Sequence, residues 1–307
     1  EVIAFSDWVR VLRKGRLVAV KKTAETEPAE LVRLMVGREV LFCLEKQNRN
    51  SGDVVLELND IRASDDKGLP TLAGVSFKIR SGEILGIAGV AGNGQKQLAE
   101  VITGLRKTTG GRIRINGEIM TNKSPFEMIC SGVSHIPADR NVRGIVGDMS
   151  VADNLAMKGY RKAPLTEKGI LHPKRILELA NRMIDAFRID TPTPQTHSKF
   201  LSGGNIQKII LAREIDACRG LLVAAYPSRG LDVGATEYVR NQIIEQSESG
   251  KAVLLISEDL EELMTVADNI AVLYEGHIMG FLTCREADTE KLGMLMAGIG
   301  ENSKNIN

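Results

Sequence analysis

The sequence has few aromatic residues, almost no net charge and no long apolar run. Only 4% of its 307 residues are aromatic, so an aromatic platform for stacking nucleic-acid bases is not expected. The formal net charge is +1 and no arginine-rich run is visible, which argues against binding to nucleic acid through a basic surface. No apolar run approaches the length that a membrane-spanning helix needs.

Cysteine is also scarce, and its spacing carries no signature. Cys43, Cys130, Cys218 and Cys284 lie far apart and form no CxxC pair. Neither a metal site nor a disulfide framework is expected, and free thiols in a reducing cytosol are the favoured interpretation. What remains is a chain long enough to bury a substantial core, and long for one compact domain.

An internal repeat indicates how this chain is organised. Residues 1–37 align without gaps on residues 262–298, and the register pairs Gly15 with Gly276. Both copies end in the same Leu-x-x-Leu-Met-x-Gly pattern. Two unrelated strand-turn-strand units would explain the glycine turns but not the shared ending.

The repeat predicts a chain that is the C-terminal half of a tandem protein. Residues 1–42 are expected to be the tail of a first domain whose remainder is absent, and residues 54–307 a complete second domain. Between them, residues 43–53 are polar and contain the run QNRNSG, which is typical of a linker.

The second copy has the pattern of an α/β domain. Continuous apolar runs predict buried parallel strands, and alternating runs near its start predict a small separate sheet. The apolar runs are 83–88, 221–225 and 252–256, and the alternating runs are 54–58 and 75–79. A polar, helix-rich middle is expected over about 124–200, including a helix over 173–187 with one apolar face.

The first apolar run leads into a glycine-rich loop, GVAGNGQKQ, at residues 89–97. A working phosphate loop reads GxxxxGK[ST], in which the lysine neutralises phosphate charge and the hydroxyl holds magnesium. Here Gln95 stands at the lysine position and Lys96 at the Ser/Thr position. The lost charge-assisted contact costs roughly 1.5–3 kcal/mol, or about ten- to a hundred-fold in affinity. The candidate nucleotide-binding residues are Gly89, Gly92, Asn93, Gly94, Gln95, Lys96 and Gln97.

A second glycine-containing run, LSGGNIQK at residues 201–208, is intact. Ser202 is at an N-cap position, because the apolar residues after it recur at helical spacing. These residues are Ile206, Ile210 and Leu211. A serine hydroxyl, the amides of Gly203 and Gly204 and the positive end of a helix dipole together make an anion site.

Three runs together resemble, in their order and spacing, the motifs of the ATPases of ATP-binding cassette (ABC) transporters. They are the glycine loop, the LSGG run and the PSRGLD run at residues 227–232. The resemblance covers essentially the full length from Val54 onward. It implies a P-loop ABC-ATPase fold with a mostly parallel sheet core, an antiparallel β subdomain and an inserted helical subdomain over about 124–200.

Against the family pattern, the catalytic positions are altered. The magnesium-binding aspartate corresponds to Ala225, the catalytic glutamate to Tyr226, the Q-loop glutamine to Ala138 and the switch histidine to Glu258. No aromatic residue is available over 66–70 for stacking on adenine. Loss of a general base typically removes about 10²–10⁴-fold of rate. We therefore expect no ATP hydrolysis by this half, weak or no ATP binding in its own site, and Mg²⁺ only at the partner half's site.

Longer runs resemble the second half of the tandem ATPase subunits of simple-sugar and nucleoside importers. These runs are GVxGNGQ from Gly89, IPxDR from Ile136, DMSVADNL over 148–155 and AAxPxRGLDVGA over 224–235.

That resemblance implies that Ser202, Gly203 and Gly204 contact the γ-phosphate of ATP held by the opposite half, with Asp232 in the D-loop. The implied partners are the N-terminal ABC half of the same protein, membrane permease subunits and, through them, a substrate-binding protein. The implied location is the cytoplasmic face of the membrane, as a peripheral subunit. The transported molecule cannot be read from this chain.

Two other functions are compatible with these motifs. One is a regulatory module that binds ATP without hydrolysing it. The other is a soluble ABC ATPase of translation or repair, a class that depends on two competent sites.

For several single residues, a structural role is the favoured interpretation. Lys96 and Glu258 are expected to be solvated side chains, and Tyr226 is expected to be a packing residue. Asp139 and Arg140 fit a surface pair or a coupling contact equally well.

Overall fold

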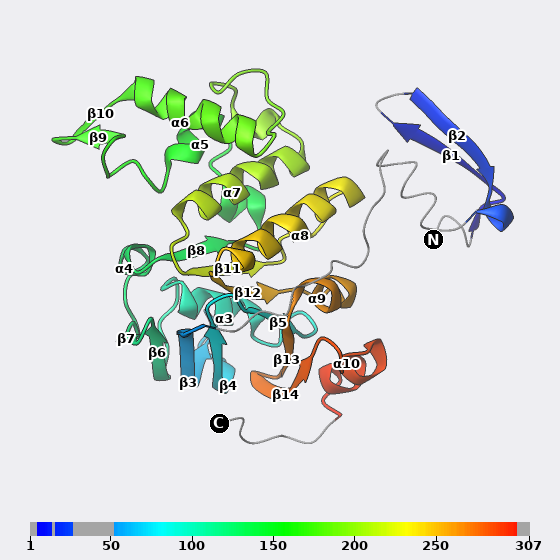
Figure 1. Ribbon diagram of the computed structural model, residues 1–307. Helices are drawn as coiled ribbons and strands as arrows, with labels where there is room; N and C mark the ends of the chain where they lie inside the picture. Colours follow the sequence, from blue (N-terminus) through cyan, green and yellow to red (C-terminus); the bar gives the residue numbers. More distant parts are fainter. Residues whose placement is uncertain (1–4, 14–15, 27–51, 300–307) are drawn as a thin grey trace.

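A computed structural model describes residues 5–13, 16–26 and 52–299, and within these residues the largest sheet has six strands (Figure 1). Its strand order is β14-β13-β5-β12-β11-β8. The strands from β13 to β8 are parallel, and β14 pairs antiparallel with β13 at one edge. Their bounds are β5 (Ile84–Ala88), β8 (Val133–Ile136), β11 (Leu221–Ala225), β12 (Ala252–Ile256), β13 (Asn269–Tyr274) and β14 (His277–Thr283).

The central strands form because their sequences are apolar throughout. Every residue of β5, β11 and β12 is buried, as the continuous apolar runs predicted. Successive side chains of a strand point to opposite faces, so Leu222 and Ala224 enter one core cluster while Leu221 and Val223 enter the other. The sheet is therefore covered on both faces, as a parallel sheet requires.

An antiparallel sheet, with strand order β4-β3-β6-β7, covers one of these faces. Its strands are β3 (Val54–Ser64), β4 (Pro70–Arg80), β6 (Gly110–Ile115) and β7 (Glu118–Ile119). The first two are longer than the expected runs of 54–58 and 75–79, because bulges shift their register and break the simple alternation. The expected antiparallel subdomain is confirmed.

Helices complete both cores (Figure 1). α3 packs with the antiparallel sheet, whereas α7, α8, α9 and α10 supply buried residues to the cluster on the opposite face. The bounds are α3 (Gln95–Ile102), α4 (Pro125–Cys130), α7 (Gly203–Ala217), α8 (Val233–Glu248), α9 (Leu260–Val266) and α10 (Thr289–Met296).

The inserted helical part contains α5 (Val151–Ala156) and α6 (Pro173–Ala186), with the small hairpin of β9 (Thr166–Glu167) and β10 (Ile170–Leu171) at its outer end (Figure 1). The expected start of this part, at about residue 124, is too early. The segment 125–136 forms α4 and β8, and β8 belongs to the six-stranded sheet. A four-residue strand that carries a serine and a histidine gives no apolar run from which to recognise it.

A buried ionic cluster ties α7 to β8 and to the helical part. Glu214 has a side-chain exposure of 1%, and it pairs with Arg213 at 2.9 Å and with Lys158. Its second oxygen also accepts a hydrogen bond from the His135 backbone N–H. Burial acts against ionisation of this carboxyl, but the charges of Lys158 and Arg213 prevail and lower the pKa of Glu214.

An N-terminal hairpin reproduces the last hairpin of the domain. β1 (Trp8–Arg13) and β2 (Arg16–Lys22), followed by the 3₁₀ turn η1 (Thr23–Glu25), form their own two-stranded sheet. When residues 1–37 are aligned on residues 262–298, β1 begins and ends at the same positions as β13, and β2 at the same positions as β14. Even the break in register falls at equivalent places, after Val11 and after Val272. The sequence repeat is therefore a structural repeat.

In the residues that the structure describes, no helix combines the length and the apolar character needed to cross a membrane.

Substitution Glu214→Ala is expected to lower the free energy of unfolding by about 3–5 kcal/mol, because it leaves buried cations without their counter-charge. Urea denaturation at neutral pH measures this change. The folded-state pKa of Glu214 is lowered, so the stabilisation is present above the ordinary unfolded carboxyl pKa of about 4.3. It is lost as the pH falls through the lower folded-state value.

Asp216→Ala is the matched control, since Asp216 pairs with Arg182 at 3.4 Å and both side chains are about half exposed or more. Its expected cost is about 1 kcal/mol at most. Equal losses in the two variants would contradict a special role for the buried cluster.

Candidate functional site

The glycine loop joins β5 to α3 in the arrangement of a phosphate loop. Gly94 precedes the helix with a φ of 109°, and a Cβ there would lie 2.5 Å from the Thr71 carbonyl oxygen. Only glycine fits at that position. Asn93 secures the loop, because its Oδ1 accepts from the Glu275 backbone N–H at 2.8 Å and its Nδ2 donates to the Val90 carbonyl at 3.0 Å. The loop thus makes the tight turn into α3 that a phosphate cradle needs.

The side chains that should meet a phosphate point elsewhere. Gln95 is 2% exposed, and its Nε2 donates to the Val90 carbonyl at 2.9 Å inside the loop itself. Its Oε1 is buried and has no hydrogen-bond partner among the residues that the structure describes. The Lys96 ammonium lies 3.9 Å from Glu100 one turn along α3, and 54% of the Lys96 side chain is exposed. Gln97, the third residue of α3, is half-buried. Backbone amides are thus the main donors available to a phosphate here.

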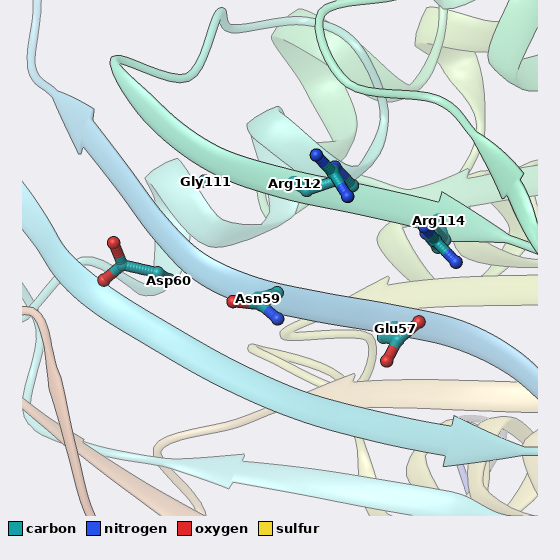
Figure 2. Close-up of a pocket in the computed structure, with 6 residues that line it drawn as sticks. All are labelled: Glu57, Asn59, Asp60, Gly111, Arg112 and Arg114. Atoms are coloured by element: carbon teal, nitrogen blue, oxygen red, sulfur yellow. The ribbon is translucent and has the colours of Figure 1, made fainter.

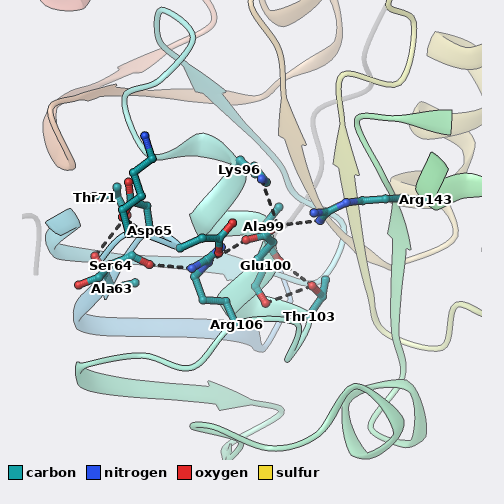
Figure 3. Close-up of polar contacts among 12 residues, drawn as sticks. Ala63, Ser64, Asp65, Thr71, Lys96, Ala99, Glu100, Thr103, Arg106 and Arg143 are labelled. Atoms are coloured by element: carbon teal, nitrogen blue, oxygen red, sulfur yellow. Dashed lines mark hydrogen bonds and ion pairs between the residues drawn. The ribbon is translucent and has the colours of Figure 1, made fainter. Parts of the chain in front are cut away.

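Figure 3 shows the charges around Glu100. One of its oxygens lies 2.7 Å from Nη1 of Arg143, and the other lies 2.8 Å from Nε of Arg106. Arg106 also donates to Asp66 at 2.6 Å, and this hydrogen bond lowers the pKa of Asp66. These contacts anchor the phosphate-loop helix to two distant segments through ion pairs within the protein.

Ala225 and Tyr226 stand at the end of β11. Ala225 is buried, and Tyr226 has a φ of 49° while its N–H donates to the Ile256 carbonyl at 2.7 Å. Burial, with a smaller contribution from the charge of Glu258, raises the pKa of Tyr226 to about 12. The phenol stays protonated at neutral pH and cannot act as a general base. Its ring packs in the core beneath the Arg229 guanidinium, 5.8 Å from the ring centroid, in agreement with the packing role expected.

The other altered positions are solvated. Ala138 and Glu258 are exposed, in agreement with the interpretation of Glu258 as a surface side chain. Within the described part of the chain, no three His, Cys, Asp or Glu side chains gather so as to hold a metal ion. The groups of the loop that would meet the phosphates of a nucleotide are its backbone amides.

The intact LSGG run is positioned as the sequence predicted. It follows the 3₁₀ turn η3 (Ser198–Phe200), and Ser202 is the N-cap of α7. Its Oγ accepts from the Asn205 N–H at 3.4 Å and from the Asn205 side-chain amide at 3.1 Å. The predicted inward residues Ile206, Ile210 and Leu211 are buried.

Asp232 caps the neighbouring helix α8, where its side chain accepts from the Ala235 N–H at 2.9 Å. A Cβ on Gly204 would lie 3.5 Å from the Ala235 Cβ, so the N-termini of α7 and α8 adjoin. Ser202 and Gly204 at the start of α7 thus lie next to Asp232 at the start of α8. In the described residues, no hydrogen bond or ion pair joins these residues to the phosphate loop at residues 89–97.

A buried carboxylate holds the D-loop through a hydrogen bond with Ser228. Glu262 is 0% exposed and accepts hydrogen bonds from Ser228 at 2.6 Å and from Ser257 at 2.7 Å. Burial raises the pKa of Glu262. Sequence reasoning did not single out this residue, since a glutamate near the start of a helix is usually solvated.

A surface hollow of about 520 Å³ lies apart from these motifs, between β3 and β6 (Figure 2). It forms where bulges displace β3 around Asp60. Charged and polar side chains line it, and nothing in the sequence pointed to it. The lining residues are Glu57, Asn59, Asp60, Gly111, Arg112 and Arg114.

Comparisons with known proteins agree with this geometry. The family model described as "ABC transporter" matches residues 72–224. The guanosine import ATP-binding protein NupO of Bacillus subtilis is 44% identical over 95% of this chain and 57% of its own length. The glucose import ATP-binding protein TsgD13 of Haloferax volcanii is 43% identical over 98% of this chain and 55% of its own length. The nucleoside import ATP-binding protein NupA of Lactococcus lactis is 39% identical over 97% of this chain and 59% of its own length. The chain thus spans less than two thirds of the length of these curated relatives.

Solved structures show the same fold. A nucleotide-free ATP-binding cassette of an ABC transporter superposes with a TM-score of 0.66 at 22% identity, over 79% of this chain and 95% of that one. The ATP-binding subunit of another ABC transporter gives 0.63 at 21% identity, over 79% of this chain and 99% of that one. The predicted fold class is confirmed.

The double variant Gln95→Lys/Lys96→Ser is expected to bind ATP about ten- to a hundred-fold more tightly than the unaltered chain, because it restores a cation and a hydroxyl to the cradle. Calorimetric titration with ATP, with and without magnesium, measures the gain. Hydrolysis should stay undetectable, since Ala225 and Tyr226 are unchanged.

Gln242→Lys is the control, because it adds a lysine on α8, outside the nucleotide loop. A similar gain from this control, or no gain from the double variant, would show that the missing lysine is not what limits binding.

Proposed function

Because this chain belongs to the family of ABC transporter ATP-binding proteins, which includes sugar and nucleoside import proteins, we propose that it completes an ATPase site held by a partner half. In this proposal the chain contributes its LSGG signature to that site. Its own nucleotide site is catalytically inactive.

One observation carries the proposal: the signature is intact and the chain's own site is not. Ser202 caps a fifteen-residue helix and leaves the amides of Gly203 and Gly204 at its N-terminus. At the other site, Gln95 bonds within its own loop and Tyr226 stands where a general base is needed. The residues of the chain's own nucleotide site are altered, whereas its signature is kept. This combination suits a half whose signature acts on the nucleotide bound by the other half.

The chemistry assigned to the signature is charge stabilisation. The Ser202 hydroxyl and two glycine amides would donate to the γ-phosphate of ATP bound by the partner's phosphate loop, and the α7 dipole would add to their effect. Preorganised donors of this kind are worth about 10²–10³-fold in rate. Mg²⁺ would be held by the partner half alone, where it would neutralise phosphate charge. Asp232 would orient the D-loop beside the signature.

We propose the following domain organisation. Residues 1–42 form the tail of a first ABC domain, residues 43–53 a linker and residues 54–307 the second domain. The shared bounds and register of β1–β2 and β13–β14 support this division. Most of residues 1–42, and all but the last two residues of the linker, lie outside the described residues.

The proposed partners are the N-terminal ABC half of the same protein and membrane permease subunits, with a substrate-binding protein reached through the permease. The relatives carry out import of guanosine, glucose and nucleosides by their names, so a sugar or a nucleoside is the proposed cargo class. Val142 and Phe200 are 78% and 74% exposed, and they would suit an apolar contact with a permease at the cytoplasmic face.

A second candidate is a regulatory site that binds ATP without hydrolysing it. The tight glycine turn into α3 favours this candidate, as does the buried Oε1 of Gln95, which has no hydrogen-bond partner among the described residues. Micromolar binding of ATP to the unaltered chain without magnesium would support it, whereas no binding at millimolar ATP would exclude it.

Gly204→Asp in the full-length protein, assembled with its permease, is expected to reduce ATP turnover by about 10²–10³-fold, because a carboxylate would replace an anion-binding site. The fold should persist, since a Cβ on Gly204 would make only an ordinary contact of 3.5 Å with the Ala235 Cβ, and an aspartate suits the first turn of a helix. Steady-state phosphate release measures turnover, and thermal unfolding checks the fold.

Gly293→Asp is the matched control, because Gly293 lies in α10 and a Cβ there would meet no atom within 4 Å. Lys96→Ala should likewise leave turnover unchanged. Near-normal turnover in Gly204→Asp would refute the proposed function.

The domain proposal makes a separate prediction about hydrogen exchange. In this chain, β1 is bonded on one side to β2, whereas β13 is bonded to both β14 and β5. The outward-facing amides of β1 should exchange quickly in this chain and slowly in the full-length protein, where a strand equivalent to β5 is expected to cover them. Equal exchange in both proteins would contradict the proposed division.

A further inference from the structure

The segment of residues 138–144 connects β8 to the helical part, and it begins at Ala138, where the family has its Q-loop glutamine. Its backbone is set by Asp139, whose Oδ1 accepts from the N–H groups of Asn141 and Val142 at 3.0 Å each. A single π-type turn, η2 (Arg140–Gly144), follows. From this turn, two arginine side chains reach separate parts of the molecule.

Arg140 contacts both elements assigned to the partner's site. Its Nη1 donates to the Arg229 carbonyl at 2.7 Å, and its Nη2 donates to the Gly230 carbonyl at 3.4 Å, so it holds the D-loop. A Cβ on Gly203 would lie 3.1 Å from Nη2, 3.5 Å from Cζ and 3.6 Å from Nε of Arg140. The guanidinium therefore lies directly against the signature.

Arg143 and Gly144 fix the other end of the segment. Arg143 pairs with Glu100 on α3 at 2.7 Å, and the Gly144 carbonyl accepts from Nη2 of the buried Arg213 at 2.7 Å (Figure 3 shows the first contact). A Cβ on Gly144 would clash with Cδ1 of Ile210, so the turn is packed closely on α7. The segment thus meets the phosphate-loop helix, the signature helix and the D-loop through protein contacts alone.

We propose that Arg140 is a positioning residue for the partner's nucleotide: it sets the D-loop and the signature relative to each other and passes displacements of residues 138–144 to both. The exposed Val142, two residues along the turn, is where a permease would displace the segment. Arg140 would then provide the mechanical link that the family's glutamine cannot provide here. This inference rests on the proposed function, because it concerns the site that the signature completes.

The test uses the full-length protein, alone and assembled with its permease, and compares Arg140→Ala with Arg140→Lys. In the assembly, Arg140→Ala is expected to lower kcat on the order of ten- to a hundred-fold, because the D-loop and signature are no longer held in register. The KM for ATP should change by less than about twofold, since the partner's phosphate loop still binds the nucleotide. The stimulation of turnover by the permease should fall toward none.

Arg140→Lys should recover part of the stimulation. A lysine ammonium can bond to one carbonyl, but it lacks the planar fork with which Arg140 bonds to two carbonyls while contacting Gly203. Arg182→Ala is the control, because it removes an arginine from an exposed ion pair on α6. Thermal unfolding of each variant, with Arg140→Lys as the conservative change, separates a functional loss from misfolding.

Two results would overturn the inference. One is normal kcat and normal stimulation in Arg140→Ala. The other is an equal loss with and without permease in both Arg140 variants, accompanied by a raised KM, which would indicate a merely structural role. If Gly204→Asp abolishes turnover while Arg140→Ala is normal, the inference fails and the proposed function stands. If Gly204→Asp is active, the proposed function itself fails.

Discussion

The parallel pairing of three fully buried strands is the constraint on which the rest of the structure depends. β5, β12 and β11 lie side by side in register, so Ile87 is opposite Ile256 and Ile256 is opposite Ala225. Their carboxyl ends therefore meet at one edge of the sheet, and the three loops that follow must lie near one another. This arrangement needs apolar strands only. The pairing of the strands does not involve the side chains of these loops, such as Gln95 and Tyr226.

Contacts within the protein engage several side chains of these loops. Gln95 bonds to its own loop, Lys96 lies near Glu100, and Tyr226 packs beneath a guanidinium. Each of these contacts joins a loop side chain to another residue of the chain.

The sequence predicted the features that depend on neighbours along the chain. Continuous apolar runs located the buried strands, helical spacing after Ser202 located α7 and its cap, and the repeat located a hairpin that recurs with the same register. The short strand β8 was missed, because Ser134 and His135 interrupt its apolar pattern. Contacts between distant segments were beyond reach: no local pattern indicates that Arg143 meets Glu100 or that Glu262 holds Ser228. For Arg140, a coupling contact and a surface pair were equally compatible with the sequence, and its bonds to the D-loop carbonyls favour the first.

The duplicated hairpin also raises a question of misassembly, since two hairpins of one register could compete for the same strand. Arg10 pairs with Val20 as Ala271 pairs with Phe281, so Arg10 is the counterpart of Ala271. Ala271 is 0% exposed beside β5, whereas Arg10 is exposed. If the N-terminal hairpin replaced β13–β14 on β5, an unpaired guanidinium would enter the core at a cost of several kcal/mol. This mismatch at one position disfavours the exchange of the two hairpins within the second domain.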